Sequence, residues 1–205
     1  MIEDDGPRGR ILAAAAELFA AEGYAGTKVD RIAKLAGVNK AALYYHVGGK
    51  EALYEATLIE NVRLVADRLE EALRDQDDPA RMLETIVRIL AAAFEKSALV
   101  PRIMAQELAR GGERLSPPVM LEFLRVFACT RRVIALGREK GLFEDVNPLL
   151  AHLNIVGTLA FAELSRSARA KARETGASMG VDWDFTTEDV VRRVLLSYDV
   201  KPKRG

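Results

Sequence analysis

The sequence predicts an all-α protein, with a short N-terminal helix-turn-helix domain and a larger C-terminal helical domain. Apolar residues recur with the helical period in most segments, and few segments show the alternation that strands require. Asp78, Ser116 and Asn147 each precede a proline, which marks a capped helix start. Glycines fall where the periodic segments stop, as helix ends favour: Gly23, Gly37, Gly48, Gly49, Gly111, Gly112, Gly141 and Gly176.

These start and stop signals predict about nine helices. They cover residues 8–22, 28–36, 39–46, 50–75, 79–96, 101–110, 117–140, 148–174 and 187–199. The first has an apolar face of Ile11, Leu12, Ala15, Leu18 and Phe19. The fourth repeats the spacing with Leu53, Leu58, Val62, Val65 and Leu69, and the fifth with Met82, Ile86, Ile89, Leu90 and Phe94. In the seventh, the same face is Leu121, Leu124, Phe127, Ala128, Val133 and Leu136.

Length and composition indicate a soluble folded protein. The chain has 205 residues, of which 49% are hydrophobic and 29% charged, so it is too apolar for a disordered chain. No apolar run reaches the about 18–20 residues that span a bilayer. Residues 1–5 are acidic and lack the apolar region of a signal peptide. We therefore expect a cytoplasmic protein, with an N-terminal helix-turn-helix domain at 1–50 that begins with an acidic tail at 1–7, and a second domain at 51–205.

The charges are unevenly distributed although the formal net charge is zero. Residues 7–50 carry seven basic and three acidic side chains, a balance of +4. Residues 51–205 carry 23 basic and 24 acidic side chains, and Glu3, Asp4 and Asp5 make up the remainder. A basic first quarter favours contact with an anionic polymer at that end.

The most informative pattern lies in residues 27–50. Thr27 is placed to cap a short helix, with Asp30 at the capping-box position, and Asn39 is placed to cap the next helix. Residues 36–38 form a tight glycine turn between them, so the segment predicts a helix-turn-helix. The spacing alone fits an ordinary hairpin of two helices equally well.

The second helix of this pair exposes a polar and aromatic row without acidic residues. Its members are Lys40, Ala41, Ala42, Tyr44, Tyr45 and His46. Lysine and tyrosine can reach base edges and thymine methyl groups in a major groove. Lys50, at the start of the next helix, can pair with a phosphate.

The same region resembles the TetR family of transcriptional repressors over about residues 8–55. The resemblance lies in Arg10-Ile11-Leu12, Leu18-Phe19, Gly23-Tyr24, Gly26-Thr27, Ile32-Ala33, Ala36-Gly37-Val38-Asn39-Lys40, Leu43-Tyr44-Tyr45-His46-Val47 and Lys50-Glu51-Ala52-Leu53. It implies DNA contacts for nine residues. Those facing bases are Lys40, Ala41, Ala42 and Tyr45, and those meeting phosphates are Thr27, Lys28, Tyr44, His46 and Lys50.

Two positions depart from the family pattern. Position 39 is often Ser in the family and is Asn here, which caps a helix equally well. Position 47 is often Phe in the family and is Val here, which changes the core packing slightly. Ala41 and Ala42 can offer only methyl contacts, so base reading is expected to depend mainly on Lys40 and Tyr45.

The resemblance also implies that helices 148–174 and 187–199 form a four-helix bundle across a two-fold axis. From the apolar pattern alone, a dimer interface and an ordinary core fit these helices equally. The expected interface residues are Leu149, Leu153, Val156, Gly157, Ala160, Leu164, Val191, Val194, Leu195 and Tyr198. A two-fold pair of recognition helices would read a palindrome.

A ligand pocket is expected in the C-terminal domain, among the five expected helices from 50–75 to 148–174. Candidate lining residues are Phe94, Met104, Phe123, Phe127 and Phe161, with Glu107, His152 and Asn154 as polar anchors. A few polar groups in an apolar cavity are typical of small-molecule sites, although the same side chains also fit a simple core. The hypothesis is a homodimeric repressor released from a palindromic operator by a small, partly apolar effector. An activator, an α-helical enzyme and a DNA-free interaction module are the alternatives.

Other chemistry is sparse in the sequence. The segment 48–51 lacks the features of a phosphate-binding loop, and the two histidines, His46 and His152, show no metal-ligand spacing. Cys129 fits a buried inert thiol better than a redox sensor. We expect no cofactor, no metal and no enzymatic activity.

Overall fold

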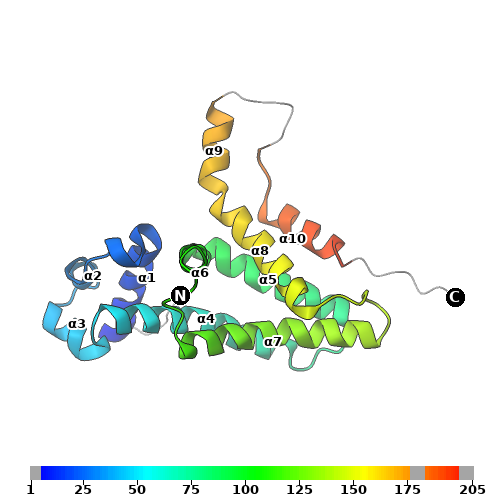
Figure 1. Cartoon of the computed structure of the whole chain (residues 1–205), viewed down its shortest axis with the longest axis horizontal. Coiled ribbons are helices and arrows are strands. Elements are labelled where there is room, and N and C mark those ends of the chain that lie inside the picture. The colour runs from blue at the N-terminus through cyan, green and yellow to red at the C-terminus, as the bar shows by residue number, and fades with distance from the viewer. Residues whose placement is uncertain (1–5, 176–182, 199–205) are drawn as a thin grey trace. The chain divides into compact units, whose positions relative to one another are not determined.

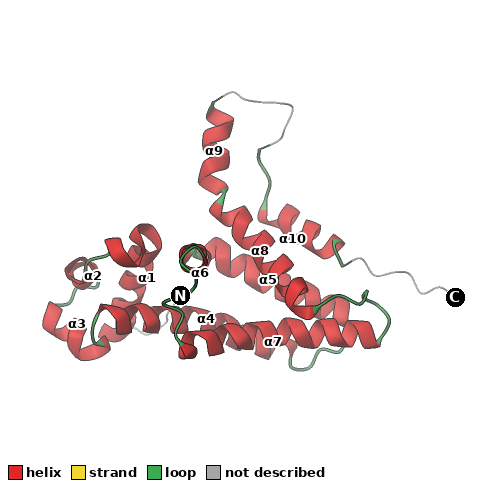
Figure 2. Ribbon diagram, viewed as in Figure 1, coloured by secondary structure: helices red, strands yellow, loops and turns green. Residues whose placement is uncertain are grey.

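The computed structural model describes residues 6–175 and 183–198, and within these ranges the chain forms ten α-helices and no strand (Figures 1 and 2). The helices are α1 (Pro7–Gly26), α2 (Val29–Leu35), α3 (Lys40–Val47), α4 (Lys50–Leu73), α5 (Pro79–Lys96), α6 (Leu99–Leu108), α7 (Pro117–Glu139), α8 (Pro148–Leu164), α9 (Arg166–Glu174) and α10 (Thr187–Leu196). The all-α prediction is confirmed.

One expected helix, at 148–174, is wrong. The chain bends by 45° at Ser165 and divides this segment into α8 and α9. The division follows composition, because α8 buries Ala151, Ile155 and Leu159, whereas α9 buries no residue. No core face therefore holds α9 in line with α8. Gly23, an expected stop, is a non-helical break with φ 70° inside α1.

The helix caps agree with the sequence at three of the proposed positions and disagree at one. The side chains of Asn39, Asp78 and Asn147 each accept backbone N–H groups of the helix that follows. Thr27 does not cap α2, since Lys28 occupies the N-cap position and makes no side-chain cap bond. The Ser116 hydroxyl donates to the Glu55 carboxylate. Gly176 lies outside the described residues.

The chain folds into two compact units. Unit 1 comprises Met1–Ala66 and Leu99–Leu124, and unit 2 comprises Asp67–Ala98 and Arg125–Gly205. Unit 1 thus contains the whole helix-turn-helix region, the first part of α4, all of α6 and the start of α7. The helices α4 and α7 each continue from one unit into the other.

The core of unit 1 holds α1 against α2, α3 and α6. Its fully buried side chains include Ile11, Leu12, Phe19, Ile32, Leu43, Leu53, Leu58 and Ile103. Each large apolar side chain buried in this way contributes about 1.5–3 kcal/mol to folding. The Phe19 and Tyr54 rings meet edge to face with centroids 5.0 Å apart. This packing gives α3 a fixed support.

Unit 2 is built around α5, which packs against both α8 and α10. Buried residues of α5 include Met82, Leu83, Ile86, Val87, Leu90 and Phe94. On the surface, Arg125 of α7 pairs with Asp67 and Glu70 of α4 at 2.6 and 2.7 Å. None of the individual helices in the described ranges is both long and apolar enough to cross a membrane; only the bent pair of α8 and α9 meets that test together.

Candidate nucleic-acid interface

The turn between α2 and α3 is shaped by a glycine. Gly37 has φ 66°, a left-handed conformation that strains any residue with a Cβ, even though a Cβ here would meet no other atom within 4 Å. The Gly37 N–H donates to Lys34 O and the Val38 N–H donates to Ala33 O, at 3.2 and 3.0 Å. These bonds close the end of α2 and direct the chain into α3, which confirms the predicted helix-turn-helix.

One side of α3 is fixed to the core. Leu43 is fully buried, and it lies in the same cluster as Ile32 and Ala33 of α2. At the start of the helix, Asn39 Oδ1 accepts the Ala42 N–H at 2.7 Å. A short helix held at one end by a cap and along one side by packing presents its other side rigidly.

The opposite side of α3 is open to solvent. Tyr45 is 87% exposed and Tyr44 is 45% exposed, while Lys40 and Ala41 are also exposed. The Tyr45 ring meets the His46 ring edge to face at 5.3 Å. Ala42 and His46 are half-buried at the margin. An aromatic side chain this exposed on a rigid helix is typical of a recognition surface.

Asp30, which sequence analysis treated as a capping residue, pairs with Lys40 instead. The Lys40 Nζ and Asp30 Oδ1 atoms are 2.7 Å apart, and both side chains are more than half exposed. The hydrogen bond and charge of Asp30 raise the pKa of Lys40 above its usual value. Lys40 therefore stays protonated. Its ion pair with Asp30 must break before the ammonium group can bind a base edge.

Lys50 begins α4 beside the end of α1. Its Nζ lies 4.6 Å from the centroid of the Tyr24 ring and 3.5 Å from the Ala25 carbonyl oxygen. The Arg114 guanidinium also lies over the Tyr24 ring, at 4.8 Å. Two cations on one ring give this part of unit 1 a concentrated positive charge.

Thr27 has an internal role that replaces its expected phosphate contact. The side chain is buried, and its hydroxyl lies 2.7 Å from Gly23 O and 3.1 Å from Leu18 O. The hydroxyl thus secures the break in α1 at Gly23. Lys28, the next residue, is exposed.

The expected dimer residues divide between surface and core. Leu153 is 57% exposed, Leu149 and Gly157 are exposed, and Val156, Ala160 and Leu164 are half-buried on α8. Leu195 and Tyr198 are half-buried, and the Tyr198 hydroxyl donates to Ala151 O at 2.9 Å. Val191 and Val194 were assigned wrongly, because both are buried against the rest of unit 2 and offer almost no surface.

The expected effector residues are divided between the two units. Met104, Glu107 and Phe123 belong to unit 1, where Glu107 is buried and Phe123 packs on the core. His152 of unit 2 lies with Nδ1 3.0 Å from the Thr130 hydroxyl, and its ring meets the Phe127 ring at 5.5 Å. These contacts give the side chains structural roles.

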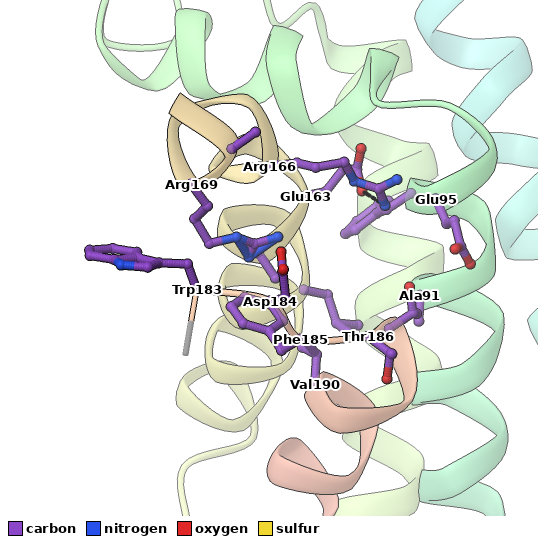
Figure 3. Close-up of a pocket in the computed structure, with 15 residues that line it drawn as sticks. Ala91, Glu95, Glu163, Arg166, Arg169, Trp183, Asp184, Phe185, Thr186 and Val190 are labelled. Atoms are coloured by element: carbon purple, nitrogen blue, oxygen red, sulfur yellow. Dashed lines mark hydrogen bonds and ion pairs between the residues drawn. The ribbon is translucent and has the colours of Figure 1, made fainter. Parts of the chain in front are cut away.

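Two further expected residues are on the surface, and one lines a cavity. Phe161 is 73% exposed and Asn154 is exposed. Phe94 lines a cavity inside unit 2, formed by α5, α8, α9 and the segment that leads into α10 (Figure 3). The other lining residues come from α5, α8, α9, α10 and the segment 183–186, and those of α9 and of 183–186 lie where the sequence shows no motif that could predict them.

Other chemical sites are limited in the part of the chain that is described. Cys129 is buried, and burial raises the pKa of its thiol, as expected for an inert side chain. No group of three His, Cys, Asp or Glu side chains among the described residues is placed to hold a metal ion.

Comparison with known proteins gives consistent matches. Residues 11–57 match the family described as "Bacterial regulatory proteins, tetR family". The HTH-type transcriptional repressor NicS of Pseudomonas putida is 30% identical over 144 residues, covering 69% of this chain and 68% of NicS. The HTH-type transcriptional activator FasR of Mycolicibacterium smegmatis is 31% identical over 141 residues, covering 67% and 62%. The structure of PfmR from Thermus thermophilus superposes with a TM-score of 0.68 at 26% identity, covering 91% and 94%.

Proposed function

Because this chain belongs to the tetR family of bacterial regulatory proteins and is a DNA-binding transcriptional regulator, not an enzyme, we propose that it is a homodimeric repressor that a small-molecule effector releases from a palindromic operator. The observation that carries the proposal is the open side of α3, where Lys40 and Tyr45 stand out from a helix whose other side is buried through Leu43. A rigid, acid-free helix of this kind fits a major groove.

The proposed contacts divide by chemistry. Lys40 and Tyr45 meet base edges, and Ala41 and Ala42 meet thymine methyl groups. A well-placed base contact contributes about 1–3 kcal/mol of discrimination against the wrong base. The contacts to phosphate, which position the protein, come from Lys28, Tyr44, His46 and Lys50. Thr27 is left out because its hydroxyl is used inside the chain.

The proposed dimer forms through the exposed side of α8. Leu149 and Leu153 leave much apolar surface uncovered there, and Gly157 allows a partner helix to approach closely. A single short recognition helix gives little affinity, whereas two related by a two-fold axis read half-sites spaced by about 34–36 Å or a multiple of it. The two-fold arrangement requires a palindromic operator.

The proposed effector acts by favouring one arrangement of the protein over another. An effector can shift that equilibrium only through its differential affinity for the two states, which typically amounts to about 1–3 kcal/mol. The helices α4 and α7 connect the units covalently and are the proposed route of the change.

Selection from a random DNA pool tests this proposal. The purified chain should enrich a palindromic sequence, protect both halves in footprinting, and sediment with two chains on each site or a multiple of two. Enrichment of a single non-palindromic half-site, or of nothing, would contradict it.

An activator is the second candidate, favoured by the likeness to FasR, which is named an activator. Transcription in vitro from a promoter carrying the selected sequence separates the two. A repressor lowers the transcript yield as protein is added, and an activator raises it.

A further inference from the structure

Unit 2 contains a cavity of about 380 Å³, partly open to solvent, between α5, α8, α9 and residues 183–190 (Figure 3). This volume falls within the range of about 300–1,000 Å³ that small-molecule sites occupy. Every described residue that lines the cavity belongs to unit 2.

The inner wall of the cavity is apolar. Phe94 and Ala91 contribute from α5, Leu159 from α8 and Val190 from α10, and all four side chains are buried. These side chains form a surface that favours an apolar group and offers it no polar partner. A ligand must place its hydrocarbon part here.

The charged groups at the cavity are mostly paired. Arg166 Nη2 lies 2.6 Å from Glu163 Oε2, and Asp184 Oδ2 lies 2.8 Å from Arg173 Nη1. Each of these cavity-lining carboxylates therefore already has a guanidinium partner. Glu95 also lines the cavity and is exposed to solvent.

Arg169 differs from the other charged residues of the cavity. Its guanidinium stacks on the Phe185 ring at 3.7 Å, which fixes the plane of its N–H groups. Its Nη1 is buried and has no hydrogen-bond partner in the described structure. A buried charged donor without an acceptor carries a desolvation cost that an incoming acceptor would remove.

We propose that this cavity binds a small amphipathic monocarboxylate, with its carboxylate on Arg169 and its hydrocarbon part against Phe94 and Leu159. A carboxylate is the planar acceptor that a guanidinium binds best. This inference rests on the proposed function in one respect, because the monocarboxylate would be the effector of the proposed repressor.

The chain provides its own reporter for this site. Trp183 is the single tryptophan of the sequence, and it lines the cavity. The probes are straight-chain monocarboxylates from hexanoate to dodecanoate, each matched with the alcohol of the same length. Binding is measured by tryptophan fluorescence and by isothermal titration calorimetry, both on the protein without DNA.

We expect saturable binding of one or more carboxylates and much weaker binding of the matched alcohols. Arg169→Gln should weaken carboxylate binding by about tenfold or more, which is the usual size of a lost charge-assisted bond. Arg169→Lys should retain part of the affinity. Arg131→Gln, at an exposed arginine of α7 in the same unit, is the matched control and should change nothing.

Three results would overturn the site: no binding of any carboxylate, equal binding of carboxylates and alcohols, or equal affinity in wild type and in a folded Arg169→Gln. Circular dichroism confirms that each variant is folded. The binding measurements contain no DNA, so a negative result does not test operator binding. Conversely, failure of the operator selection would not affect the measurement of carboxylate binding.

Discussion

The Tyr54 hydroxyl donates a hydrogen bond to Glu107 Oε1 across 3.0 Å, and both side chains are buried inside unit 1. Glu107 Oε2 also accepts the Arg114 N–H at 3.3 Å. Burial and the bond to Glu107 raise the pKa of Tyr54 well above its usual value, so the phenol stays protonated and remains a donor. The pair joins α4 to α6 and gives Glu107 a structural role inside unit 1.

Tyr54→Phe tests that role. Removing the hydroxyl leaves a buried carboxylate oxygen without its donor, and we expect unfolding free energy to fall by about 1–3 kcal/mol. Glu107→Gln keeps an acceptor oxygen and should cost less. Urea unfolding measures both, with Tyr44→Phe as the exposed control. A loss in Tyr54→Phe no larger than in Tyr44→Phe would refute the prediction.

Asp30→Asn should strengthen DNA binding. The substitution frees Lys40 from its ion pair, so the lysine no longer exchanges a partner on binding. Both side chains of the pair are exposed and screened by solvent, so the expected gain in affinity is small, no more than about fivefold. Glu17→Gln removes the same charge elsewhere on unit 1 and is the control, measured by fluorescence anisotropy. Equal gains in the two variants would show a general charge effect without a role for the pair.

Lys50→Ala should weaken specific and random DNA alike. A phosphate contact carries no sequence information, so its loss lowers both affinities and reduces the salt slope by about one. The control is Lys96→Ala, at an exposed lysine of unit 2. An unchanged salt slope would show that Lys50 stays with Tyr24 and Ala25 when DNA is bound.

Gly157→Leu should prevent dimer formation without unfolding the protomer. A Cβ at this position meets no atom within 4 Å in the protomer, so a larger side chain fits there until a second α8 approaches. Sedimentation velocity should show monomers, while Ala128→Leu, at another exposed small residue on α7, stays dimeric. Dimeric Gly157→Leu would exclude this face as the interface.

The lowered pKa of His152 predicts how the free energy of unfolding depends on pH. Burial lowers this pKa below the usual 6.5, so His152 binds a proton more weakly in the folded protein than in the unfolded chain. Unfolding free energy should therefore fall as the pH falls below about 6.5. His152→Gln should flatten that decrease in urea unfolding between about pH 5 and 7, whereas His46→Gln, at the other histidine, should not. Matching profiles for wild type and His152→Gln would exclude this role.

Local features of the fold could be predicted from the sequence, and features that depend on distant residues could not. The caps at Asn39 and Asp78 and the turn at Gly37 are set by neighbouring residues, so the helix-turn-helix was predicted almost to its ends. The Asp30–Lys40 pair needs two helices to meet. The contact between Arg169 and Phe185 joins α9 to the segment before α10, and it depends on the bend between α8 and α9. The hydrophobic periodicity of the sequence does not predict such a contact.

Buried and interfacial apolar residues share one sequence pattern, which explains the error at α10. Val191 and Val194 repeat with the helical period, as an interface would, but that period faces α5 and α8 of the same unit. Leu153 has the same character on α8 and remains exposed. Only the packed structure separates the two cases.

The most direct measurement of base reading by α3 compares Lys40→Ala with wild type on the selected operator and on random DNA, by anisotropy at fixed salt. Lys40 is proposed to contact a base edge, so the variant should lose about tenfold on the operator and much less on random DNA, which lowers the ratio of the two affinities. Equal losses on both DNAs would contradict base reading by Lys40 and reduce it to a phosphate contact.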